Sequence, residues 1–151
     1  MFIEGQGVRQ NYPEGVRWLK KAADKLDAEA LSFLGSMHYD GHKGAGVKKD
    51  RTAAFPYFLK ATKAGDFDSI VLLILMYAIG DGVKRNYPES YKWASYLNHV
   101  STIAGKGRPD VWSRKEIWSG KALANLRKKM TVKEIKRAGY LATRCIKDEK
   151  C

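Results

Sequence analysis

Histidine is the side chain best suited to acid–base chemistry at neutral pH. The chain has three, His38, His42 and His99, which are scattered along the sequence. None of them has a nearby nucleophile in a recognisable catalytic motif, and no serine stands in a G-x-S-x-G arrangement. The sequence therefore predicts no catalytic residue, and we expect a protein that is not an enzyme.

Phosphate and metal sites are not indicated either. The stretch GHKGAGVKKD at 41–50 contains glycines and lysines, but it lacks the spacing of a phosphate-binding loop. We interpret it as an elongated turn, with an anion site as the alternative. Asp66, Asp68 and Asp81 do not have the spacing of a calcium loop. The sequence predicts no cofactor and no metal.

The two cysteines, Cys145 and Cys151, lie at the C-terminal end of the sequence. On a continuous helix, residues six apart point about 120° away from a common face, so a disulfide would need the last turn to unwind. The favoured interpretation is that both thiols are free. A small terminal disulfide, formed in an oxidising compartment, is the alternative. A zinc site is not supported, because no further Cys or paired His accompanies them.

The net charge of +12 is unevenly distributed. Residues 1–104 hold 14 Lys and Arg against 11 Asp and Glu, whereas residues 105–151 hold 14 against 5. A basic end attracts acidic proteins, nucleic acids or anionic membrane surfaces. The longest apolar run, IVLLILMYAI at 70–79, is only half the roughly 20 residues that a membrane-spanning helix needs, so we expect a buried helix there.

Candidate partner-binding residues are concentrated in this basic end. Trp112 lies beside Arg114 and Lys115, and an exposed tryptophan flanked by arginine is typical of protein interfaces. Nucleic acid is the alternative partner, because lysines and arginines could contact phosphates and Trp112 could stack on a base. No recognised nucleic-acid-binding module is present, and an acidic protein is preferred. The candidate partner-binding residues are His42, Lys43, Trp112, Arg114, Lys115, Arg127 and Lys128.

These side chains must be positioned by a repeated element. GVRQNYPEGVRW at 7–18 returns as GVKRNYPESYKW at 82–93, and a degenerate copy, GVKKDRTAAFPY, lies between them at 46–57. Valine recurs at spacings of 39 and 36 residues. A fixed period of this size is typical of stacked helical repeats.

Each repeat unit reads as two helices joined by a glycine turn. The second helix is predicted to begin at Asn11, Asp50 or Asn86, whose side chains can cap it. Glu14 and Glu89 follow three residues after a cap, as in a capping box. The first helices are predicted at 28–41 and 68–82, with Ala30, Leu34 and Gly35 allowing close packing. The recurring aromatic residues are predicted to be core or inter-repeat packing residues: Tyr12, Trp18, Tyr87 and Trp93.

This pattern resembles the Sel1-like repeat family, a relative of the tetratricopeptide repeats. The repeat residues that carry the resemblance are Gly7, Val8, Asn11, Trp18, Ala30, Leu34, Gly35, Gly41, Gly46, Val47, Asp50, Ala54, Ala61, Gly65, Tyr77, Gly80, Gly82, Val83, Asn86, Trp93 and Leu97. The sequence departs from the family pattern at His38 and Tyr57, and at Pro56, which is predicted to kink or shorten its helix. The resemblance implies an all-α fold, a right-handed α-solenoid of helix–turn–helix units with a concave protein-binding surface.

The resemblance covers residues 1–104, with a truncated first repeat, and residues 105–151 are predicted to be two basic capping helices. After His99 the stretch STIAGKGRPD reads as a loop, with Asp110 capping the helix that follows. Thr131 with Glu134 forms a second capping-box pattern before a helix whose apolar face is Val132, Ile135, Ala138, Ala142 and Ile146. Solenoid ends need such a cap.

The resemblance also implies the kind of function. Some bacterial members are periplasmic scaffolds or signalling regulators, and others are immunity proteins that neutralise a toxic secreted effector. We expect a non-enzymatic protein-binding module, with the immunity role favoured by the small size and basic charge and the scaffold or signalling adaptor as the alternative. A periplasmic location is expected, with any signal peptide outside this sequence; the cytoplasm is the alternative.

Overall fold

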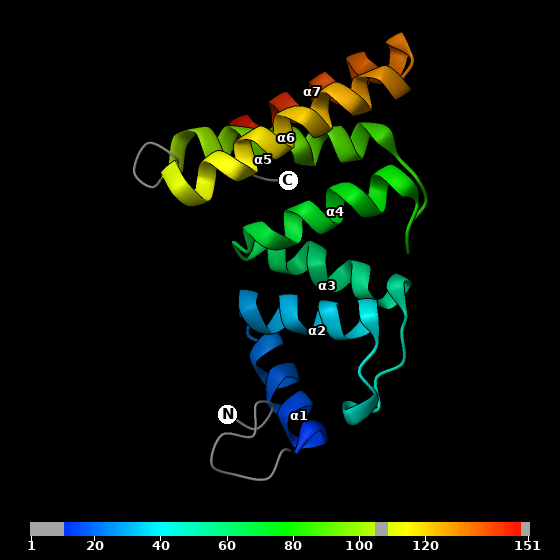
Figure 1. Ribbon diagram of the computed structural model, residues 1–151, viewed down its shortest axis with the longest axis vertical. Coiled ribbons are helices and arrows are strands. Elements are labelled where there is room, and N and C mark those ends of the chain that lie inside the picture. The colour runs from blue at the N-terminus through cyan, green and yellow to red at the C-terminus, as the bar shows by residue number, and fades with distance from the viewer. Residues whose placement is uncertain (1–10, 105–108, 149–151) are drawn as a thin grey trace. The chain divides into compact units, whose positions relative to one another are not determined.

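The computed structural model describes the backbone of residues 11–104 and 109–148, and the side chains of 11–104 and 119–148. In this part the chain forms α-helices and a short 3₁₀ turn, η1, but no β-strand beyond an isolated bridge between His42 and Val47. The elements, in order, are α1 (Tyr12–Ala23), α2 (Ala28–Asp40), η1 (Lys43–Ala45), α3 (Arg51–Lys63), α4 (Phe67–Ile79), α5 (Tyr87–Ala104), α6 (Pro109–Lys129) and α7 (Val132–Asp148) (Figure 1). The predicted all-α fold is confirmed.

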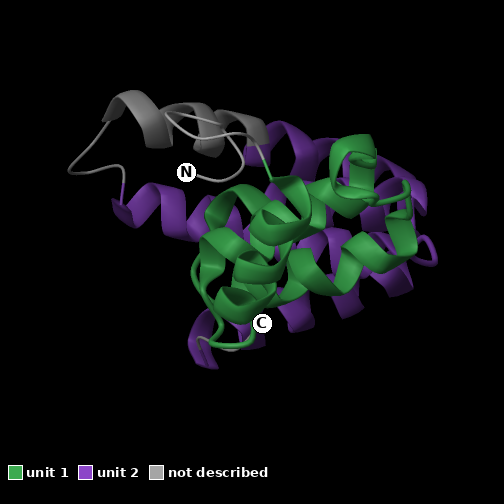
Figure 2. Cartoon of the chain, turned by 90° about the horizontal axis from the view of Figure 1, so that it is seen from below, with its two compact units in different colours: residues 1–69 green, residues 70–151 purple. Residues whose placement is uncertain are grey.

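The chain divides into two compact units, residues 1–69 and 70–151 (Figure 2). The division by contacts falls within α4, whereas the sequence pattern separates repeats from cap after residue 104. The first division follows contacts between residues and the second follows the sequence repeats, so one does not test the other. The boundary between repeats and cap stays a prediction.

The predicted helix starts are confirmed at all three repeat junctions. The side-chain oxygen of Asn11 accepts a hydrogen bond from Glu14 N at 3.2 Å, Asp50 accepts one from Ala53 N at 2.9 Å, and Asn86 accepts one from Glu89 N at 3.2 Å. Each bond satisfies a backbone donor that would otherwise lack a partner in the first turn.

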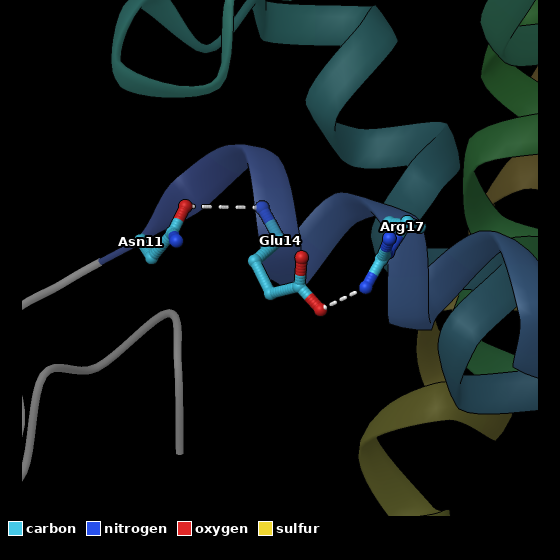
Figure 3. A network of polar contacts seen from close by, with 3 residues as sticks. All are labelled: Asn11, Glu14 and Arg17. Carbon is cyan, nitrogen blue, oxygen red and sulfur yellow. Dashed lines mark hydrogen bonds and ion pairs between the residues drawn. The ribbon is translucent and has the colours of Figure 1, made fainter.

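The first-turn glutamates do not complete a capping box. Glu14 Oε1 accepts from Arg17 Nη2 at 2.6 Å, so its carboxylate points forward along α1 rather than back to Asn11 (Figure 3). Glu89 likewise pairs with a lysine, since its Oε2 lies 2.8 Å from Lys92 Nζ. The capping-box prediction is wrong at these two positions, because a cation three residues later attracts the carboxylate. At the other predicted site, Thr131 N donates to the Glu134 carboxylate at 2.8 Å and Glu134 N donates to Thr131 Oγ1 at 3.3 Å, so that box is closed.

A residue with positive φ follows each of the helices α1 to α4. Gly41 and Gly80 follow α2 and α4 with φ of 79° at each, which confirms the predicted use of glycine there. The turn between α1 and α2 differs, because Leu26 has φ of 61° and its side chain is 63% exposed. The corresponding turn between α3 and α4 has Gly65 with φ of 100°. An L-residue with a Cβ is disfavoured in this left-handed region.

The core of the first unit consists of small and aliphatic side chains of α1, α2 and α3. Leu34 is 1% exposed, and Val47 packs against this core from the turn. Gly35 is predicted to allow close packing, and it does: a Cβ added at Gly35 would lie 2.7 Å from Cε1 of Phe58, which is fully buried. Ser69 Oγ, at the start of α4, also bonds Ser32 Oγ of α2 at 3.3 Å. The buried core residues are Val16, Ala23, Ala30, Leu31, Leu34, Met37 and Ala61.

The core of the second unit is built around Trp93, which is 1% exposed. Ser90 Oγ donates to the carbonyl of Ile74 at 2.7 Å, so α5 lies directly against α4. The prediction of a buried tryptophan is confirmed for Trp93 but is wrong for Trp18, which is 51% exposed. Residues 1–10, which precede α1 and include Gly7 and Val8, lie outside the described part.

Two helix boundaries differ from the predictions. α3 runs through Pro56 without shortening. Pro56 and Thr52, whose carbonyl loses its donor, are both exposed to water. The predicted loop after His99 begins later, because α5 continues to Ala104. Ser101 and Thr102 lie in this last part of α5, and their hydroxyls donate to the carbonyl of Asn98 at 3.0 and 2.8 Å.

The C-terminal helices α6 and α7 both pack against α5. α6 begins at Pro109, a residue favoured at the first helical position, so Asp110 lies inside the helix and does not cap it. In α7, Ala138 and Ala142 are buried as predicted, but Val132 is 72% exposed and Cys145 takes a place in the core. The apolar face therefore begins after the first turn of α7.

The favoured prediction of free thiols is wrong, because Cys145 is disulfide-bonded and no cysteine in the described part of the chain is free. The sequence holds one other cysteine, Cys151. Residues six apart diverge by about 120° only on a continuous helix, and α7 ends at Asp148.

Candidate functional site

The second unit has an open groove of about 370 Å³ between α4 and α6. Ile74 and Leu126 form its buried floor, at 2% and 5% exposure. Leu75 and Ile79, one turn apart on α4, are 43% and 65% exposed. Large aliphatic side chains left this open to water beside a groove are typical of a surface that binds another molecule. The lining residues are Ile74, Leu75, Ala78, Ile79, Lys121, Ala122, Asn125, Leu126 and Lys129.

The α6 side of this groove is basic. Lys121, Asn125 and Lys129 are spaced by four residues and are exposed, so they follow one face of the helix. Neither lysine forms an ion pair with a residue in the described part of the chain, and no carboxylate lines the groove. The groove therefore combines an aliphatic wall with a row of available positive charge.

The first unit has a different groove, of about 410 Å³, beside α2 and the start of α4. Its polar lining is acidic, with Glu29, Asp66 and Asp68, and Phe33 is 40% exposed at its edge. Asp66 already has a structural role, since its carboxylate accepts hydrogen bonds from the backbone and the hydroxyl of Ser69 at the start of α4. This groove is less suited to an acidic partner than the groove of the second unit.

The elongated turn at 41–50 is organised by local contacts. His42 Nδ1 accepts a hydrogen bond from Ala45 N at 3.2 Å, and its ring lies 4.8 Å from the ring of Tyr12, centroid to centroid. A Cβ added at Gly44 would lie 2.8 Å from the Tyr12 ring. His42 therefore holds the turn against α1, while Lys43 is exposed. Partner binding by these two residues stays a prediction.

The predicted partner-binding residues are divided between the two units. His42 and Lys43 belong to the first unit, and Arg127 and Lys128 are exposed on α6 but do not line its groove. The side chains of Trp112, Arg114 and Lys115 lie outside the described residues.

Sequence reasoning missed four groove residues, Leu75, Ile79, Lys121 and Lys129. The signal available was the run at 70–79, which is apolar on all sides and therefore exceeds what one buried helix face requires.

The interior of the second unit contains no arrangement suited to acid–base catalysis among the described residues. Burial, with a smaller contribution from the carboxylate of Glu89, raises the pKa of Tyr77 above its usual value. Lys92 Nζ pairs with Glu89 and lies 4.6 Å from the centre of the Trp93 ring.

No group of three or more metal-binding side chains occurs in the described part, and none of its helices is long and apolar enough to span a membrane.

The sequence matches the Sel1 repeat family model over residues 1–25, 28–66 and 75–96, more than half of the chain. The chain belongs to the Sel1 repeat family. In the described part, the matched segments contain α1, α2, α3, the end of α4 and the start of α5, and the fold is an α-solenoid of helix–turn–helix repeats. Sel1 repeats are protein-interaction scaffolds, so membership of the family indicates a protein partner.

Individual relatives agree with this assignment. A protein of Acanthamoeba polyphaga mimivirus, described as Sel1-like repeat-containing, is 37% identical over 59 residues, which is 39% of this chain and 10% of that protein. The crystal structure of a protective antigen of uropathogenic Escherichia coli strains, displaying an SLR fold, aligns at TM-score 0.64 and 27% identity over 89% of this chain and 26% of the antigen.

A Sel1 repeat protein from Oxalobacter formigenes shares the fold at TM-score 0.55 and 24% identity, over 96% of this chain and 69% of that protein. The chain spans only a tenth of the viral relative and about a quarter of the antigen. Partners and activities of those whole proteins are therefore not transferred to it.

Proposed function

We propose that this Sel1 repeat protein is a non-enzymatic binding module that holds an acidic protein partner on the groove of its second unit. The observation that carries the proposal is the combination of Leu75 and Ile79, exposed on one wall, with Lys121 and Lys129, which have no ion-pair partner in the described part. The aliphatic wall favours burial, and the lysines favour a partner that brings carboxylates.

The groove alone is too small to hold a stable complex. Complete burial of an aliphatic side chain contributes about 1.5–3 kcal/mol, and Leu75 and Ile79 are already partly covered. Exposed ion pairs add about 0.2–1 kcal/mol each. Association costs on the order of 4–15 kcal/mol, and stable interfaces bury roughly 800 Å² on each partner. The partner must therefore contact more of the protein than the groove.

The more specific role is that of an immunity protein, which binds and neutralises a toxic secreted effector. Its support is the family resemblance, the small size and the net charge of +12. A scaffold or signalling adaptor is the other form of the same binding function. The disulfide at Cys145 supports a periplasmic location, because disulfides persist in oxidising compartments.

Affinity purification of the chain from its native host, followed by mass spectrometry and repeated at raised salt, tests this function. We expect one stoichiometric acidic protein, retained less well as salt screens the lysines. A secreted effector encoded beside this protein would support the immunity role, and a signalling protein would support the adaptor. Recovery of nucleic acid alone, lost steeply with salt, would contradict the proposal and make the basic α6–α7 pair the binding element.

A further inference from the structure

We infer that the groove between α4 and α6 binds an amphipathic α-helix of the partner, with aliphatic residues on one face flanked by carboxylates. This inference rests on the proposed function and specifies the binding element. It follows from the secondary structure of the groove walls, the spacing of the lysines and the absence of carboxylates among the lining residues.

Both walls of the groove are helices. Their backbone N–H and C=O groups bond within each helix, so they offer no edge to which an extended peptide could add as a strand. An extended segment lying over Leu75 and Ile79 would have to desolvate its own backbone groups without a partner. A helix brings its backbone hydrogen bonds with it, and so it can lie on an apolar surface without that cost.

The basic row sets the spacing of the charges on the partner. Lys121 and Lys129 are eight residues apart on α6, which corresponds to about 12 Å along the helix axis at 1.5 Å per residue. A partner helix running along α6 therefore places carboxylates seven or eight residues apart to meet both lysines. Its aliphatic residues at positions i and i+4 between them contact Leu75 and Ile79, which have the same spacing on α4.

Other occupants fit the groove less well. In a symmetric dimer of this chain, the same surface would face itself and bring lysine rows together without a carboxylate from the groove. A nucleic acid would offer phosphates to Lys121 and Lys129, but the aliphatic pair Leu75 and Ile79 provides no aromatic ring for a base to stack on. A helix with both aliphatic and acidic side chains contacts the aliphatic wall on α4 and the lysines on α6.

The test uses the full chain and three synthetic 18-residue peptides with identical leucine positions. One carries glutamates seven residues apart, the second carries lysines at those positions, and the third is the acidic peptide with a central proline that breaks the helix. Two-dimensional NMR reports which residues respond. We expect only the helical acidic peptide to bind, with shifts at Ile79, Lys121 and Lys129, and the affinity to fall as salt is raised.

Two charge-reversal variants make the test specific. The double variant Lys121→Glu/Lys129→Glu should bind the acidic peptide about tenfold more weakly and should gain affinity for the lysine peptide. Arg127→Glu/Lys128→Glu is the matched control, because it makes the same change of charge on the same helix outside the groove lining and should retain binding. Circular dichroism verifies that both variants keep their helix content.

Several outcomes would overturn the inference. These are equal weakening by both double variants, equal binding of the proline peptide, shifts confined to other surfaces, and self-association that depends on Lys121 and Lys129. If the native partner is captured equally well by Lys121→Glu/Lys129→Glu, the groove is not its binding site, although the protein-binding function stands. If no protein partner is captured by any form of the chain, the proposed function itself fails.

Discussion

Replacement of Gly35 by alanine should destabilise the first unit, although alanine is the better helix former. A Cβ at this position would lie 2.7 Å from Cε1 and 2.8 Å from Cδ1 of Phe58, closer than nonbonded carbon atoms can approach. Phe58 is fully buried, so its ring cannot turn away into solvent. Overpacking of this kind costs about 1–3 kcal/mol, and the gain in helix propensity returns up to about 1 kcal/mol.

The net expected effect of Gly35→Ala is a loss of about 1 kcal/mol in the free energy of unfolding. For a chain of this length, that corresponds to a fall in Tm of roughly 2–4 °C. The measurement is urea unfolding followed by circular dichroism, with the m-value compared with that of the wild-type chain so that a change in unfolding mechanism is recognised.

Gly139→Ala provides the matched control. It is the same chemical change in the interior of a helix, α7, but no atom lies within 4 Å of the added Cβ, so it should stabilise the chain by about 1 kcal/mol. Adding Phe58→Leu to Gly35→Ala should recover part of the loss, giving a favourable coupling in a double-mutant cycle. If Gly35→Ala is as stable as the wild-type chain or more so, the reasoning about close packing is wrong.

Three further predictions follow from other sites. Thr62→Val should raise the free energy of unfolding by about 1 kcal/mol in urea titrations, because the buried hydroxyl of Thr62 has no hydrogen-bond partner among the described residues; a loss of stability would contradict this. Cys151→Ser should lower Tm in the absence of reductant by removing the only cysteine with which Cys145 can pair within the chain, and adding reductant should then change nothing further. Thr131→Ala should raise the pKa of Glu134 part of the way toward its usual value in an NMR titration, because it removes the hydrogen bond from the hydroxyl but keeps the backbone N–H of residue 131, which is the larger cause of the lowered pKa. Since that pKa is lowered by folding, the associated stability is present above the usual carboxyl range and is lost as pH falls through the lowered pKa; an unchanged pKa in the variant would show that the hydroxyl bond does not contribute to the lowering.

Features determined within a few residues were predictable from the sequence. The caps at Asn11, Asp50 and Asn86 depend on a side chain and a backbone N–H three residues away, and all three formed. The capping boxes predicted at Glu14 and Glu89 did not form, because each glutamate pairs with the basic residue three positions later, which the capping-box pattern does not include.

Features that depend on neighbouring helices were not predictable in the same way. Trp18 and Trp93 occupy equivalent repeat positions, but only Trp93 has a described helix before it to cover it. The groove is a similar case. Leu75 and Ile79 belong to an apolar run that predicts burial, and their exposure depends on how far α6 lies from α4. The distance between two helices cannot be derived from the spacing of residues along one of them.

The capping hydrogen bond at each turn–helix junction joins residues three positions apart, and this short range affects how the chain folds. Hydrogen bonds between different helices join Ser90 with Ile74, Ser119 with Asn98, and Ser69 with Ser32, which are 16, 21 and 37 positions apart. Closure entropy grows slowly with loop length, and proteins rich in local contacts fold faster than those dominated by non-local pairings. During synthesis, each repeat can therefore dock on its predecessor as soon as it is complete, without waiting for the C-terminal helices.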